Sequence, residues 1–106
     1  MSCELIVAVT TVETEDDAQA IAQALVGEGL AACVQIERID SVYRWAGTVQ
    51  QSAERRLLVK TTAERWPALQ ARIRELHPYE LPAVYAWPVT HADAAYADWV
   101  LSAVAG

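Results

Sequence analysis

The sequence predicts an α+β fold of the ferredoxin-like βαββαβ type, with a long hairpin between the second and third strands and an added C-terminal helix. Three observations lead to this prediction. Strand-like and helix-like segments follow one another in the order strand, helix, strand, strand, helix, strand. Residues 30–61 show no helical face and one turn, at Ala46 and Gly47. Residues 92–104 then form an apolar stripe with helical spacing.

Length and composition limit the class of protein. The 106 residues suit one domain, expected to span residues 1–106, and 54% hydrophobic with 21% charged residues is a globular balance. No apolar run approaches the roughly 18 residues of a membrane helix, so no membrane partner is expected. The net charge of -6 argues against a nucleic-acid partner and suits cations. With only Cys3 and Cys33 as cysteines and no secretion signal at the start, we expect a cytoplasmic protein.

The first strand and the first helix are predicted from residues 5–29. The β-branched run 5–9 indicates a buried strand that ends at Thr10 and Thr11. Thr14 is placed to cap a helix that stops at the glycines of positions 27 and 29. Its apolar positions have helical spacing: Ala18, Ile21, Ala22, Leu25 and Val26. This helix is expected to cover a sheet.

The hairpin predicts an oligomer. Two strands of about 14 residues reach about 45 Å, whereas a helix of the same length covers only about 21 Å. The far half therefore extends beyond its own helices, and its apolar side chains need cover from another subunit. These side chains are Val42, Tyr43, Trp45 and Val49. A bulge near residues 37–40, where the alternation slips, would shorten the reach.

The second half of the chain predicts a helix, a strand and a final helix. The second helix is expected to begin between Thr61 and Pro67, with Trp66, Leu69, Ile73 and Leu76 on its core face. Residues 81–89, bracketed by prolines, predict the fourth strand. In the final helix, the apolar stripe is Ala92, Ala95, Tyr96, Trp99, Val100 and Ala103. It is expected to lie against the sheet or a neighbouring subunit.

Residues 75–82 are the best place to look for a site. Pro78 and Pro82 disfavour helical geometry at the residue before each, so the connection carrying His77, Tyr79 and Glu80 is stiff. A stiff loop holds the partners of a ligand in place. The alternative is that His77 only finishes a helix and Glu80 is solvated.

Two kinds of ligand remain open. Cys33 with His77 and Glu80 would form a thiolate, imidazole and carboxylate set suited to Cu²⁺ or Zn²⁺, if the fold brings them together. Alternatively Cys33 is a small buried hydrophobe. No phosphate loop, nucleophile elbow, HExxH or CxxC motif is present, so we expect a protein that is not an enzyme.

A second hypothesis is an aromatic pocket. Lys60 with Tyr43, Trp45 and Tyr79 would line a pocket with one cationic anchor for a small anion. Alternatively, Lys60 is solvated, as a lysine at a strand end usually is.

Four stretches of the sequence are typical of one family: residues 29–34, Tyr43-Arg-Trp45 with Gly47, residues 58–61, and His77-Pro-Tyr-Glu-Leu-Pro82. The chain closely resembles the CutA divalent-ion tolerance family over nearly its whole length. This resemblance implies a ferredoxin-like fold similar to that of the PII signalling proteins, and a tight homotrimer in which the hairpins build sheets between subunits.

The resemblance also implies a function. It points to tolerance of divalent metals, notably copper, with binding at positions matching Cys33 and the His77 loop. Some members carry a cysteine where this chain has Thr10, a hard and weak ligand for copper, so low affinity is expected. The sequence therefore predicts a cytoplasmic, non-enzymatic homotrimer that binds Cu²⁺ or Zn²⁺. The alternatives are a PII-like trimeric sensor that binds a small anionic metabolite in the cleft between subunits, and a trimeric scaffold for a partner protein.

Overall fold

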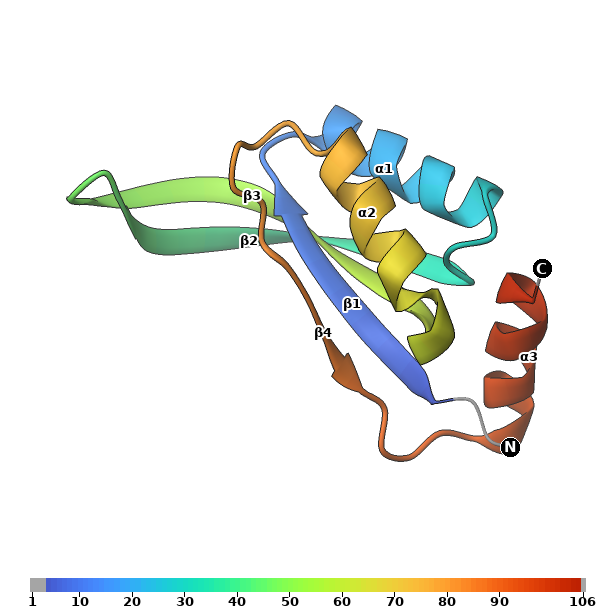
Figure 1. Ribbon diagram of the computed structural model, residues 1–106. Coiled ribbons are helices and arrows are strands. Elements are labelled where there is room, and N and C mark those ends of the chain that lie inside the picture. The colour runs from blue at the N-terminus through green and yellow to red at the C-terminus, as the bar shows by residue number, and fades with distance from the viewer. Residues whose placement is uncertain (1–3, 106) are drawn as a thin grey trace.

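The computed structural model describes residues 4–105 as a four-stranded antiparallel sheet with helices α1 and α2 packed on one face (Figure 1). The strand order is β2-β3-β1-β4. The elements are β1 Leu5–Val12, α1 Glu15–Gly27, β2 Cys33–Trp45, β3 Thr48–Thr62, a 3-10 turn Ala63–Arg65, α2 Trp66–Leu76, β4 Val84–Pro88 and α3 Ala94–Val104. The predicted ferredoxin-like fold is confirmed. Cys3 lies outside the described residues.

The first strand is longer than expected. It continues through Thr10 and Thr11 to Val12, because Thr11 and Val12 still pair with β3. The helix cap is confirmed, since Thr14 Oγ1 accepts a hydrogen bond from the Asp17 N–H at 3.1 Å. Val26, expected on the core face of α1, is instead 44% exposed. The other four predicted positions are buried against the sheet and α2.

The hairpin of β2 and β3 extends well beyond the helices (Figure 1). Its pairing runs one-to-one from Cys33 opposite Lys60 to Trp45 opposite Thr48, so the bulge considered near residues 37–40 is absent. Ala46 and Gly47 both have positive φ, 51° and 82°, which suits a two-residue turn that follows the strand twist. The longest dimension of the structure is 47 Å, against 25 and 22 Å for the others. The predicted long arm is therefore present.

In the second half of the chain, the end of β4 and the exposed side of α3 differ from the prediction. The helix α2 begins at Trp66 after a 3-10 turn, within the predicted range. The strand β4 is shorter than the predicted residues 81–89, because its pairing with β1 ends at Val84 and Pro82 has no N–H to donate. In α3, Val100 and Val104 are buried, whereas Tyr96 and Trp99 of the predicted stripe are 42% and 48% exposed.

Two apolar clusters hold these elements together. The larger lies between the sheet and the helices α1 and α2, and includes Ile21, Leu57 and Ile73. The smaller packs α3 against the start of β1 through Leu5 and Val100. Across residues 4–105, no helix combines the length and the apolar character needed to cross a membrane.

Candidate functional site

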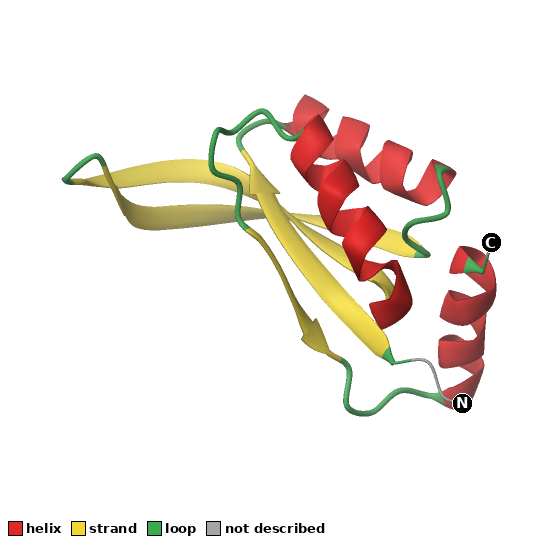
Figure 2. Ribbon diagram, viewed as in Figure 1, coloured by secondary structure: helices red, strands yellow, loops and turns green. Residues whose placement is uncertain are grey.

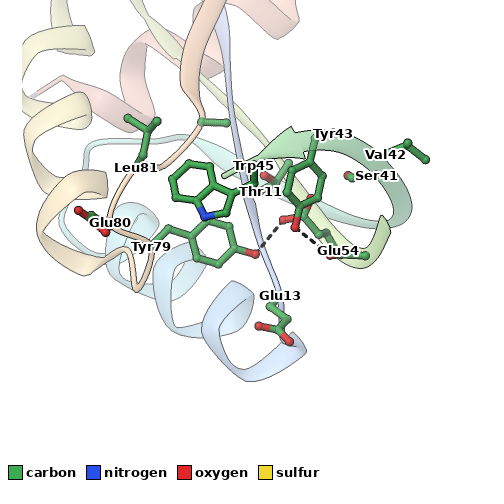
Figure 3. Close-up of a pocket in the computed structure, with 12 residues that line it drawn as sticks. Thr11, Glu13, Ser41, Val42, Tyr43, Trp45, Glu54, Tyr79, Glu80 and Leu81 are labelled. Atoms are coloured by element: carbon green, nitrogen blue, oxygen red, sulfur yellow. Dashed lines mark hydrogen bonds between the residues drawn. The ribbon is translucent and has the colours of Figure 1, made fainter. Parts of the chain in front are cut away.

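A pocket of about 690 Å³ lies where three segments meet. They are the end of β1, the distal half of the hairpin and the connection between α2 and β4. Figure 2 shows this connection passing the end of β1. Figure 3 shows the side chains that line the pocket. The lining residues are Thr11, Glu13, Ser41, Val42, Tyr43, Trp45, Ser52, Glu54, Tyr79, Glu80, Leu81 and Ala83.

His77 holds the α2–β4 connection to the end of β1. Its ring Nδ1 accepts a hydrogen bond from the Tyr79 N–H at 3.1 Å, so Nε2 carries the proton and donates to the Thr11 carbonyl at 2.8 Å. The side chain is buried, and burial lowers the pKa of His77, although the Thr11 carbonyl and nearby carboxylates act in the opposite direction. His77 is therefore neutral, with both ring nitrogens occupied by backbone groups.

Tyr79 reaches from this connection to the hairpin. Its phenol donates to Glu54 Oε2 at 2.8 Å, and its ring meets that of His77 edge-on at 4.8 Å between centroids. Burial, and then the adjacent Glu54 carboxylate, raise the pKa of Tyr79 far above its usual value. The phenol therefore stays protonated and remains a donor at physiological pH.

Glu54 is the unusual member of the pocket. It is only 7% exposed, and among residues 4–105 its side chain accepts one hydrogen bond, from the neutral Tyr79 phenol. The ion pairs within residues 4–105 join other carboxylates to Arg55, Arg56 and Arg72. The second oxygen of Glu54, Oε1, is not among the buried atoms that lack a partner, because Glu54 lines the open pocket.

The remaining lining residues are aromatic or acidic. Tyr43 and Trp45 stand 42% and 49% exposed on the hairpin, and Tyr43 Oη lies 3.0 Å from Ser52 Oγ. Glu13 and Glu80 are exposed at the pocket edge. Within the described part of a single chain, the pocket lining contains no lysine, arginine or histidine. Its charge chemistry therefore suits a cation.

The structure brings together only part of the predicted site. Tyr43, Trp45, Tyr79 and Glu80 all line the pocket, and His77 lies behind it. By contrast, Cys33 pairs with Lys60 at the base of the hairpin. Lys60 is six residues along β3 from Glu54, which corresponds to about 20 Å on an extended strand. Lys60 Nζ donates there to Gln35 Oε1 at 2.6 Å.

Cys33 and His77 are therefore not neighbours within one chain. The described part of the chain holds no group of three or more His, Cys, Asp or Glu side chains placed to bind one metal ion. A metal at His77 would also have to replace one of its two backbone partners. The set Cys33, His77 and Glu80 remains a prediction.

Sequence reasoning missed Glu13 and Glu54. A signal for Glu54 existed, because the two-residue turn sets the hairpin register and places Ser52 opposite Ser41 and Glu54 opposite Ile39. Glu54 thus falls on the same face as Tyr43. What the sequence did not indicate is that Tyr79 folds over this face and buries the carboxylate.

Comparison with known proteins gives consistent matches. A model of the family described as CutA1 divalent ion tolerance protein matches residues 6–103. The divalent-cation tolerance protein CutA of Thermus thermophilus is 45% identical over 95 residues, which are 89% of this chain and 92% of that protein. The mouse Protein CutA is 39% identical over 94 residues, 88% of this chain and 53% of its own length. The chain thus spans about half of that mammalian relative.

Solved structures agree with the sequence matches. The structure of CutA from Synechococcus elongatus superposes with a TM-score of 0.94 at 41% identity, covering 98% of this chain and 93% of that one. The Thermus thermophilus divalent cation tolerance protein superposes with a TM-score of 0.87 at 44% identity, covering 91% and 94%.

Proposed function

The chain belongs to the CutA1 divalent ion tolerance family, and from this premise we propose that it binds divalent cations and thereby contributes to metal tolerance. Cu²⁺ is the first ion of this proposal and Zn²⁺ the second, both at low affinity. The protein acts as a cytoplasmic homotrimer and catalyses no reaction. The observation that carries the proposal is the family match over residues 6–103.

The proposed ligands come from two subunits. Cys33 offers a thiolate and is only partly buried, and Glu80 offers an exposed carboxylate. They lie apart within one chain, so a shared metal requires the Cys33 end of one subunit to approach the Glu80 loop of another. His77 supports this loop, and it ligates a metal only if one of its ring nitrogens is released from the backbone.

Calorimetric titration with Cu²⁺ and Zn²⁺ tests the proposal. We expect Cys33→Ser and Glu80→Gln each to weaken binding, and His77→Gln to weaken it less. Glu75→Gln is the matched control, because Glu75 is an exposed carboxylate on α2 outside the pocket. Heats that are the same for the wild type, Cys33→Ser and Glu80→Gln would remove these two residues from the site. Absence of heat with both metals would contradict direct binding.

The competing ligand class, a small anionic metabolite, has less support. Its intended anchor, Lys60, lies about 20 Å along β3 from Glu54 of the same chain, so an anion site, like the metal site, would need the hairpin base of a neighbouring subunit. A third reading, a scaffold for a partner protein, would be favoured by a pull-down that succeeds without added metal.

A further inference from the structure

We propose that Tyr79 and Glu54 are positioning residues for the Glu80 carboxylate of the proposed metal site. The inference rests on the proposed function and deepens it, because neither Tyr79 nor Glu54 is among the proposed ligands. It uses hydrogen bonds within one chain, which do not depend on what a neighbouring subunit covers.

Glu80 depends on the adjacent residues for its position. It lies in the connection of residues 77–83 between α2 and β4, which has no regular secondary structure. Among residues 4–105, the exposed Glu80 side chain makes no hydrogen bond and no ion pair. A loop that becomes ordered only when it ligates a metal loses conformational entropy at that moment, which weakens binding. A contact that fixes the backbone beside Glu80 beforehand therefore strengthens metal binding.

Tyr79, the residue directly before Glu80, provides this contact. Its phenol donates a hydrogen bond to Glu54 Oε2 at 2.8 Å, and Figure 3 shows the ring directed at Glu54 while Glu80 lies away from this bond. The Tyr79 N–H also donates to His77 Nδ1 at 3.1 Å, so the backbone and the side chain of Tyr79 are both held. A hydrogen bond from a hydroxyl group to a carboxylate is stronger than one between neutral groups.

Glu54 suits the role of acceptor because it belongs to a rigid element. It lies in β3 opposite Ile39, within the continuous pairing of the hairpin, and is only 7% exposed. A residue on a paired strand holds its partner more precisely than a residue on a loop. Residues that orient a metal ligand from behind strongly affect metal affinity without touching the ion. Glu54 therefore acts on Glu80 through Tyr79.

Calorimetric titration of the full chain with Cu²⁺, in its native assembly, tests this role. We expect Tyr79→Phe, which loses only the hydroxyl group, to weaken Cu²⁺ binding by about tenfold. Glu54→Leu should weaken it by a similar factor, whereas Glu54→Gln keeps an acceptor oxygen and should stay within about twofold of the wild type. Tyr96→Phe is the matched control, because Tyr96 is exposed on α3 outside the pocket, and it should leave the affinity unchanged.

A Glu80→Gln background separates positioning from a general loss of stability. If Tyr79 acts through Glu80, Tyr79→Phe should not weaken Cu²⁺ binding further once the Glu80 carboxylate is gone. An equal loss in both backgrounds would show that the phenol supports only the fold or the assembly, and would overturn the proposal. A Glu54→Gln variant as weak as Glu54→Leu would also overturn it, because the charge of Glu54, and not its hydrogen bond, would then attract the cation.

NMR relaxation of the metal-free protein measures the position of the loop independently. We expect the order parameter of the Glu80 N–H to fall from the rigid range, about 0.85, to below about 0.6 in Tyr79→Phe and Glu54→Leu but not in Glu54→Gln. An unchanged order parameter in Tyr79→Phe would contradict the positioning role, whatever the metal result. Absence of Cu²⁺ and Zn²⁺ binding by the wild type would instead contradict the proposed function, so the two failures are distinguishable.

Discussion

Thr10 and Thr61 are two buried threonines whose hydroxyl groups are in opposite situations. Both are fully buried, in adjacent strands. Thr61 Oγ1 donates to the Leu30 carbonyl at 2.8 Å, whereas Thr10 Oγ1 has no hydrogen-bond partner among the described residues. An unpaired buried hydroxyl is destabilising, because it has lost water without gaining a partner. Thr10 is thus a weak point of this core.

Replacing each threonine with valine should therefore have opposite effects. Thr10→Val removes the unpaired hydroxyl at nearly constant shape, and we expect the free energy of unfolding to rise by about 1 kcal/mol. Thr61→Val leaves the Leu30 carbonyl without its donor and should lower the free energy of unfolding by about 1 kcal/mol. Urea unfolding measures both. Destabilisation by Thr10→Val would show that its hydroxyl has a partner in solution.

His77 makes the stability of the pocket depend on pH. Its neutral ring is required, because Nδ1 must accept from the Tyr79 N–H. Burial lowers the folded pKa of His77 below its unfolded value, despite the opposing Thr11 carbonyl and the carboxylates of Asp17 and Glu54. The stabilisation is therefore complete above the unfolded pKa, about 6.5, and is lost as the pH falls through the folded pKa.

This prediction is checked by thermal unfolding at pH 7.5 and pH 5.5. At pH 7.5 we expect His77→Gln to cost about 1–2 kcal/mol, since two hydrogen bonds are disturbed. The difference from wild type should shrink at pH 5.5. His91→Gln is the control, because His91 is the other histidine of the chain and is exposed. An equal cost of His77→Gln at both pH values would contradict the assigned role.

At the scale of elements, the hairpin turn determines which residues of the arm face the pocket. A two-residue turn makes the register one-to-one, so Tyr43, Ser52 and Glu54 share one face. Ala46 occupies a positive φ of 51° that residues with a Cβ adopt at a cost, whereas Gly47 adopts its φ of 82° freely. The residue type therefore suits the backbone conformation at Gly47, the second turn position, whereas the backbone is strained at Ala46, the first.

Substitutions at the turn should change stability without a steric contribution. Ala46→Asn should stabilise the fold by about 0.5–1 kcal/mol, since asparagine tolerates this conformation. Gly47→Ala should destabilise it by about 1 kcal/mol. Apart from Gly47 and its two chain neighbours, no heavy atom of residues 4–105 lies within 4 Å of a Cβ built at Gly47, so this cost is conformational. Denaturant unfolding measures both, and a neutral Gly47→Ala would mean that the tip changes conformation.

At the scale of the whole molecule, the arm leaves apolar surface without cover in a single chain. Val42 and Val49 are 68% and 65% exposed at the far end of the hairpin, and Trp87 and Trp99 are nearly half exposed elsewhere. The outer strands β2 and β4 also present unpaired backbone groups. These features support the proposed homotrimer, in which neighbouring copies cover the exposed apolar side chains and pair with the open strand edges.

Sedimentation equilibrium tests the assembly directly. We expect the mass of three copies of the 11.6 kDa chain at micromolar concentration. Val42→Asp places a charge on the surface that neighbours would cover, and it should shift the equilibrium toward smaller species. The exposed substitution Ala71→Asp on α2 serves as the control, since α2 packs on the subunit's own sheet. A folded wild-type monomer would contradict the trimer and the two-subunit metal site.

The order of elements, the Thr14 cap, the hairpin turn and its long reach all follow from the sequence. Each depends on residues a few positions apart, whose geometry is local and nearly independent of the rest of the chain. The strand ends at Val12 and Val84 were predicted less well, because pairing with another strand decides where a strand stops. The candidate loop around His77 was also identified, since its prolines act locally.

Only the tertiary structure decided which residues share the pocket. Tyr79 reaches Glu54 across 25 positions, and His77 reaches Thr11 across 66. Such contacts depend on how the α2–β4 connection crosses the end of β1, which no local pattern specifies. The same long-range packing separated Cys33 and Lys60 from the pocket of their own chain and placed the Glu54 carboxylate against the Tyr79 phenol. The chemistry of the site follows from that packing, because contacts between residues far apart in the sequence determine which partners each ionisable side chain has.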